Sequence, residues 1–143
     1  MSRLTINEAG TSGYTDEIIL TAGDFTAAAG NAAQLINLPV KKGDVIDGAA
    51  IEVTTAFVGL SSPTLTVGSD SSVAPDDATS LMEAVAIDAL STAANTGDNL
   101  DGTTNRAIVA AADGNLEIHG NVDISAATAG KARLLLSIKR ING

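Results

Sequence analysis

Short segments in which apolar and polar residues alternate recur along most of this chain. In the clearest one, Leu116, Ile118, Val122 and Ile124 fall on one side and polar residues fall on the other. Gly120 interrupts the apolar side, which marks a bulge or a close backbone approach. A period of two is typical of a half-buried β-strand, and turn residues separate the segments. The pattern predicts an all-β protein of roughly eight strands, an antiparallel β-sandwich of jelly-roll or Greek-key type.

One segment near residues 80–90 admits two interpretations. Ser80 offers a helix N-cap with Glu83 three residues later, which is the spacing of a capping box. Leu81–Leu90 then contains neither glycine nor proline. A short helix is therefore predicted near 80–90, and the alternative is an irregular strand through Met82 and the alternate residues after it.

The length of 143 residues fits one domain. We expect residues 15–143 to form a single β-sandwich, and residues 1–14 to form a polar N-terminal arm that becomes ordered on assembly. Alanine supplies 25 residues and only three are aromatic, so the core should be thin and contacts between subunits should add stability. Residues 1–20 show no secretory signal, and no apolar run is long enough to span a membrane.

Most side chains that perform catalysis are missing. The chain has no cysteine and one histidine, His119, so thiolate catalysis, disulfides and cysteine-ligated zinc are excluded. The sequence has no nucleophile elbow for which His119 could act as the general base. The predicted strand also directs His119 away from the apolar side. The acidic residues of the loops lack a tryptophan or tyrosine beside them that would stack a sugar. We therefore predict a protein that is not an enzyme, with no catalytic residue, no cofactor and no small-molecule substrate.

Among possible ligands, calcium has the most candidate binding residues in the sequence, because it takes carboxylate and carbonyl oxygens from flexible loops. Asp98 and Asp101, in the segment D-N-L-D-G, are the candidate ligands. They do not follow the spacing of an EF-hand loop, so the sequence assigns no metal site.

Charge is distributed unevenly along the chain. Residues 1–123 hold 17 acidic and four basic residues, a net charge of −13, whereas residues 124–143 hold four basic residues and no acid, a net charge of +4. The total of −9 argues against a nucleic-acid partner, which needs a basic face. The basic end indicates either a final strand paired with acidic neighbours in its own sheet or a basic edge that meets a partner. The interface candidates are Arg3, Leu4, Lys131, Arg133, Lys139 and Arg140.

Three segments carry a resemblance to a known group of proteins. Residues 51–70 read I-E-V-T-T-A-F-V-G-L-S-S-P-T-L-T-V-G-S-D, residues 80–84 read S-L-M-E-A, and residues 129–136 read A-G-K-A-R-L-L-L. This order is similar to small structural proteins of tailed bacteriophages, in which a V-T-x-A-F-x-G strand end leads to an L-T-V-G-x-D strand and an acidic loop. Their closing strand carries T-A-G-K-x-R. The similarity spans residues 33–90 and 105–141.

The resemblance implies a virion structural protein, most simply a capsid decoration (cement) protein. Such proteins are rich in β-structure, often trimeric, and lie on the outer shell where coat subunits meet. The implied partners are the major capsid protein and further copies of the chain in a homotrimer, with no nucleic acid and no membrane. The implied location is the capsid surface of the virion, after synthesis in the host cytoplasm. The alternative is a tail- or fibre-associated β-sandwich that binds a carbohydrate or a receptor.

Overall fold

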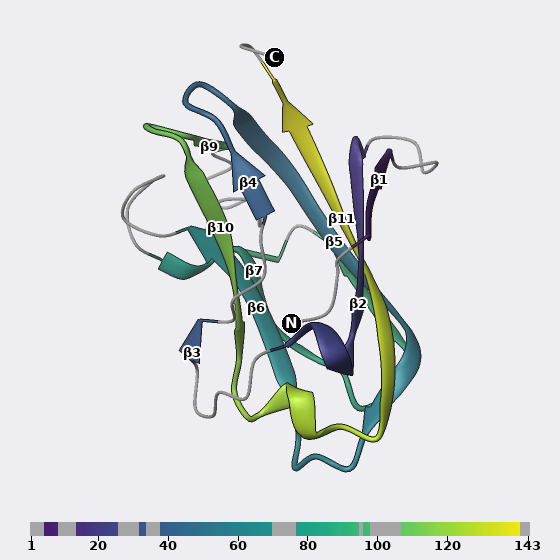
Figure 1. Cartoon of the computed structure of the whole chain (residues 1–143). Helices are drawn as coiled ribbons and strands as arrows, with labels where there is room; N and C mark the ends of the chain where they lie inside the picture. Colours follow the sequence, from purple (N-terminus) through teal and green to yellow (C-terminus); the bar gives the residue numbers. More distant parts are fainter. Residues whose placement is uncertain are drawn as a thin grey trace.

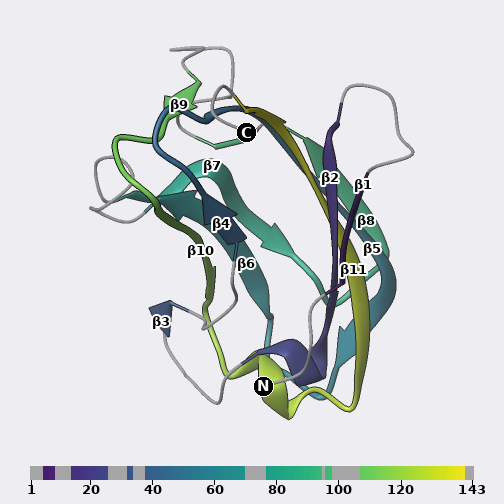
Figure 2. The ribbon, with the colours of Figure 1, turned by 45° about the horizontal axis from the view of Figure 1, so that its top comes forward.

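The chain forms two antiparallel β-sheets that face each other, as the sequence predicts (Figure 1). The computed structural model describes residues 5–8, 14–25, 32–33, 38–69, 77–94, 96–97 and 107–140. Figure 2 shows the two layers on either side of the molecule. The prediction of an all-β antiparallel sandwich is therefore confirmed.

Sheet A contains six strands in the order β1-β2-β11-β5-β8, and β9 also pairs with β5. Its longest ladder joins β5 to β11, so the last strand of the sequence lies at the centre of the sheet. Part of the predicted N-terminal arm, β1, pairs with β2 at one edge. The strands are β1 (Thr5–Glu8), β2 (Asp16–Thr21), β5 (Val45–Val58), β8 (Ser91–Ala94), β9 (Ile108–Val109) and β11 (Ala129–Lys139).

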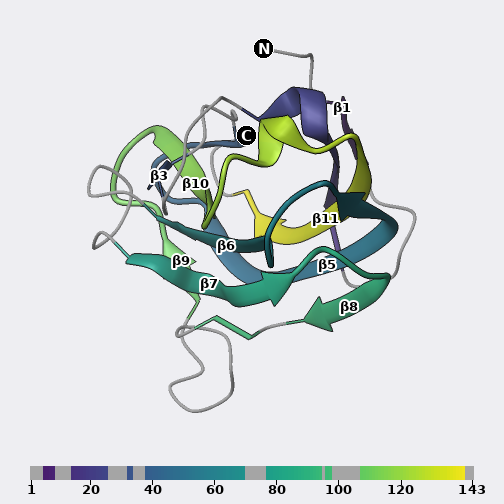
Figure 3. The same ribbon diagram turned by 90° about the horizontal axis from the view of Figure 1, so that it is seen from below.

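Sheet B contains five strands in the order β3-β10-β6-β7, and β4 also pairs with β10. Two short 3-10 helices, η1 and η2, lie side by side at the end of the sandwich seen in Figure 3. Neither described helix is long or apolar enough to cross a membrane. The elements are β3 (Ala32–Ala33), β4 (Leu38–Val40), β6 (Thr64–Ser69), β7 (Asp77–Ala86), β10 (Gly114–Gly120), η1 (Ala22–Asp24) and η2 (Ile124–Ala126).

The core lies between the sheets and is built from the apolar side of each alternating segment. Its two aromatic residues, Phe25 and Phe57, meet edge to face with ring centroids 6.3 Å apart. Gly130 of β11 passes directly beside the Phe57 ring, where a Cβ atom would come within 2.2 Å of it. Gly120 makes a similar close approach, because a Cβ there would lie 2.8 Å from Ile124 Cγ1. Both glycines therefore let the backbone approach the core.

The helix predicted near residues 80–90 is wrong: residues 77–86 form the strand β7. The registers Leu65↔Val85 and Val67↔Met82 leave one extra residue on β7, and a second irregularity follows toward Ser69. These bulges turn the consecutive residues Leu81 and Met82 both into the buried layer, which hides the period of two. Pairing with β6 on one side, and contacts with Thr96 and Gly97 on the other, satisfy backbone groups of this segment and outweigh the local capping signal.

Hydrogen bonds close one side of the sandwich between the edges of the two sheets. Phe57 of β5 donates its N–H to the carbonyl of Ile87 at 2.9 Å. Farther along, Gly97 donates its N–H to the carbonyl of Leu81 at 3.2 Å, and Glu83 N–H donates to Thr96 Oγ1 at 3.2 Å. The chain thus leaves sheet A after β8 and runs along the edge of β7.

Candidate functional site

The four basic candidates near the C-terminal end are brought together by β11. Lys131, Arg133 and Lys139 lie on this strand, and Arg140 directly follows it. Because β11 is flanked by β2 and β5, Lys131 and Arg133 stand beside residues of both neighbouring strands, and Lys139 stands beside Val45 of β5. The candidates Arg3, Leu4, Asp98 and Asp101 lie outside the described residues.

Arg133 links two glutamates on neighbouring strands across the outer face of sheet A. Its Nε and Nη2 donate to Glu17 Oε2 at 2.9 and 2.6 Å, and its Nη1 donates to Glu52 Oε1 at 3.0 Å. These hydrogen bonds, with Glu17 first, raise the Arg133 pKa above its usual value. The bridge offsets the repulsion between the two acids on β2 and β5.

Arg140 and Asp16 form a two-point ion pair at the end of the sandwich. Nη1 and Nη2 of Arg140 donate to Oδ1 and Oδ2 of Asp16 at 3.0 and 2.7 Å. Burial of Asp16 opposes its ionisation, but hydrogen bonds from Arg140 and Thr15 outweigh burial and lower its pKa. Hydrogen bonding to Asp16 in turn raises the pKa of Arg140.

Lys139 pairs with Asp47, which stands at an irregularity of the β5–β11 ladder. Burial of Asp47 opposes its ionisation, but hydrogen bonds from Lys139 and Ser137 outweigh burial and lower its pKa. Lys131, by contrast, is exposed, and no ion pair is found for it within the described part of the chain.

Pairing with acidic neighbours in the same sheet is therefore what the structure shows for three of the four basic residues. A role for them in an interface stays a prediction. The acidic partners Asp16, Glu17, Asp47 and Glu52 are not identifiable as such from the sequence, because their pairing depends on strand register. The sequence offers one signal for such acidic partners, which is a charged residue inside a segment of alternating apolar and polar residues.

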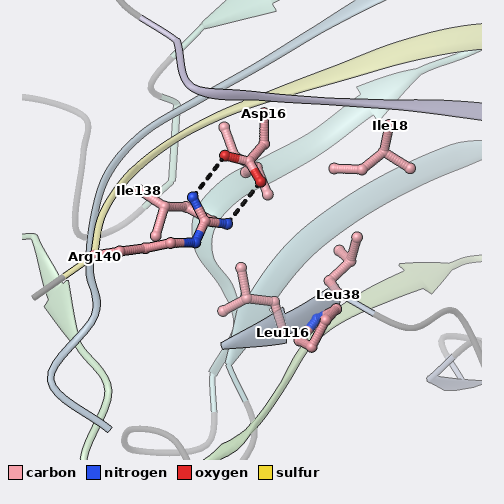
Figure 4. A pocket seen from close by; sticks show the side chains of 8 residues that line it. Asp16, Ile18, Leu38, Leu116, Ile138 and Arg140 are labelled. Carbon is pink, nitrogen blue, oxygen red and sulfur yellow. Dashed lines mark hydrogen bonds and ion pairs between the residues drawn. The ribbon is translucent and has the colours of Figure 1, made fainter. Parts of the chain in front are cut away.

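An apolar pocket of about 80 Å³ opens between the two sheets beside the Asp16–Arg140 pair (Figure 4). Sheet A and sheet B each contribute to its wall, and buried aliphatic side chains make up most of it. The ion pair stands at the side of this pocket and supplies its polar groups. The lining residues are Asp16, Ile18, Leu38, Pro39, Leu116, Leu136, Ile138 and Arg140.

The chemistry of this pocket suits an aliphatic group rather than a reaction. A volume of 80 Å³ exceeds the roughly 10–15 Å³ that one water requires, and an aliphatic wall offers water few partners. Asp16 is held ionised by its lowered pKa, whereas a general acid needs a raised one. A second hollow, lined by Pro39, Lys41, Asp44 and Arg140, adjoins it and shares two of its residues.

His119 lies on the opposite sheet, on β10, and its Nε2 is 2.9 Å from Glu117 Oε2. It shares a face of β10 with Glu117, opposite the buried Ile118, as predicted, but its side chain is only 16% exposed and is therefore mostly covered. Within the described residues, no three acidic or histidine side chains gather as a metal site would require.

No protein-family model matches the chain, and no curated protein matches it in sequence. Among solved structures, it is similar to a chain of the capsid of Ralstonia phage GP4. That similarity covers 96% of this chain and 92% of the other, with a TM-score of 0.49 and 18% sequence identity.

Proposed function

We propose that the chain is a structural component of a tailed-phage virion, and specifically a decoration protein that binds the outer capsid surface. In this role it stabilises contacts between coat subunits and works as a homotrimer. Stabilising contacts between coat subunits is a mechanical role, so it requires binding surfaces and a stable β-sandwich rather than a catalytic group.

The observation that carries the proposal is where the phage-like segments lie. Residues 51–70 contribute the second half of β5, the following turn and β6, while residues 129–136 belong to β11. The strands β5 and β11 form the longest ladder of sheet A, and β6 lies inside sheet B. The resemblance therefore concerns strands of both layers of the sandwich, including the connection from β5 in sheet A to β6 in sheet B.

The charges of the described surface agree with this role. Three basic side chains at β11 are already paired within the sheet, and the whole chain keeps a net charge of −9. An acidic surface keeps a protein made in many copies soluble before assembly. The same charge disfavours unspecific binding to the packaged genome.

The test uses virions of the phage whose genome encodes this chain. Particles are purified, the tails are detached, and heads and tails are analysed separately by quantitative mass spectrometry. We expect many copies on the heads, together with a lower bursting temperature for heads stripped of the protein. Copies found only with the tails would support the tail-associated alternative, and absence from washed particles would refute both. Sedimentation of the free protein tests the trimer.

A further inference from the structure

Strand β8 forms an edge of sheet A, and among the described residues none pairs with its outer side. Its residues are Ser91, Thr92, Ala93 and Ala94, and its described ladder is to β5 alone. Alternate residues of an antiparallel edge strand direct their N–H and C=O groups away from the sheet. Native edges are usually blunted by proline, by charged side chains or by a covering segment, and β8 contains neither proline nor a charge.

Two edge strands of sheet B, β4 and β7, differ from β8 in this respect. On β4, the exposed Pro39 cannot donate a backbone hydrogen bond. On β7, Thr96 and Gly97 already occupy backbone groups of the edge. Within the described residues, β4 and β7 thus carry a protection that β8 does not, and β8 lies at the periphery of the molecule in Figure 3.

An apolar side chain and a shallow groove adjoin this edge. Leu90 immediately precedes β8 and is 70% exposed, the highest value among the large hydrophobic side chains of the described residues. A groove of about 530 Å³ runs beside it over the outer face of β5 and β8. Its lining residues are Glu52, Val53, Thr54, Leu90, Ser91 and Thr92.

The charge around the groove is negative. Glu52 lines it, and the exposed Asp88 stands two residues before Leu90. The basic residues Lys131, Arg133 and Lys139 lie on β11, two strands from β8, and no basic residue is among those that line the groove within the described part of the chain. Arg133 is shared between Glu52 and Glu17, which leaves those three side chains with one net negative charge.

We propose that β8 accepts an extended segment of a partner protein by β-strand addition, and that this segment carries lysine or arginine beside aliphatic residues. The backbone of the segment pairs with the open edge, an aliphatic side chain packs on Leu90, and a basic side chain faces Glu52 and Asp88. A second copy of this acidic chain is the poorer occupant, since it would bring further negative charge to the groove. The proposal does not depend on a role in a virion.

The experiment is an NMR titration of the ¹⁵N-labelled full chain with the peptide acetyl-Lys-Val-Thr-Val-Lys-Val-amide. Two control peptides are used. One has glutamate in place of both lysines, and the other has proline in place of the second valine. The matched variants are Thr92→Lys and Thr92→Glu, because Thr92 is exposed and pairs with Glu52 across the ladder. Both change one exposed side chain of the edge, and melting curves verify that they fold.

We expect shifts confined to residues 90–94 with the lysine peptide. The Thr92→Lys variant should bind it about two- to fivefold more weakly than the original chain and Thr92→Glu about as much more tightly, from the usual range of cross-strand charge pairs. Leu90→Ser should also weaken binding. Shifts elsewhere, no binding, or equal binding of the lysine and glutamate peptides would overturn the proposal. So would concentration-dependent self-association through β8 without peptide, which would identify a second copy as the occupant.

Discussion

The passage of Gly130 beside Phe57 provides a quantitative test of the packing. A methyl group added at Gly130 would come within 2.2 Å of Phe57 Cδ2 and 2.4 Å of its Cγ. The ring is fully buried and fixed against Phe25, so it has little room to yield. Overpacking of a core typically costs about 1–3 kcal/mol, and the positive φ of Gly130, +155°, adds a backbone cost.

The two contributions can be separated with a control glycine. Gly59 also has a positive φ, +89°, but an added Cβ there meets nothing closer than 3.5 Å. Gly59→Ala should therefore show the backbone cost alone, about 1–2 kcal/mol. Gly130→Ala should show that cost plus overpacking, about 2–5 kcal/mol in total.

Equilibrium urea unfolding followed by far-ultraviolet circular dichroism measures both free energies. In a Phe57→Ala background, which itself should cost about 3–5 kcal/mol, the overpacking at Gly130 disappears because the ring is gone. The cost of Gly130→Ala should then fall to the value for Gly59→Ala. If Gly130→Ala costs no more than Gly59→Ala in the original chain, or costs the same with and without Phe57, the reasoning is refuted.

Three further outcomes follow from the ion pairs and the chain crossing. Because the Asp16 pKa is lowered in the fold, its contribution to stability is present above its unfolded pKa and is lost as the pH falls through the lower folded value, below about 4. Asp16→Asn should therefore reduce stability by about 1 kcal/mol at neutral pH, given the exposure of Arg140, and should flatten the acid limb of a urea-midpoint profile; an unchanged limb would contradict the assignment. Gly97→Ala, which places a Cβ 2.1 Å from the Leu81 carbonyl carbon, should speed hydrogen exchange along β7, and unaltered exchange there would argue against the crossing. Arg133→Met should lower stability by less than about 1 kcal/mol at low salt, and by less again at 1 M salt, where exposed charges are screened; a cost that does not change with salt would show that packing dominates.

How far the sequence predicts the fold depends on how regularly each strand pairs. The segment from Leu116 to His119 alternates apolar and polar residues without interruption, and it lies in β10, in a regular ladder with β6. β7 contains extra residues in its ladder, and these bulges remove the periodic signal that identifies a strand. Local capping chemistry at Ser80 then favours the wrong element.

The sequence predicts that basic and acidic residues can pair within a sheet, but it does not predict which residues pair. The sequence shows a basic final segment and acidic earlier ones, so pairing within a sheet is one of two interpretations. Which acids meet Arg133 or Arg140 depends on the neighbours and register of β11, and these are properties of the tertiary structure. The apolar pocket is likewise formed by strands of both sheets, and no single segment contains its pattern.

The position of β11 connects the uneven charge of the sequence with the order in which the fold can be completed. β2 and β5 carry acidic residues on the outer face of sheet A, and they become neighbours of a basic strand only when β11 lies between them. The hydrogen bonds of Arg133 and Arg140 span 81 to 124 residues of sequence. Such distant pairing makes folding slow, since loop closure precedes the contacts that reward it. The basic segment at the end of the chain thus supplies both the central strand of sheet A and the countercharge for its neighbours, and sheet A cannot form its described order before that segment is present.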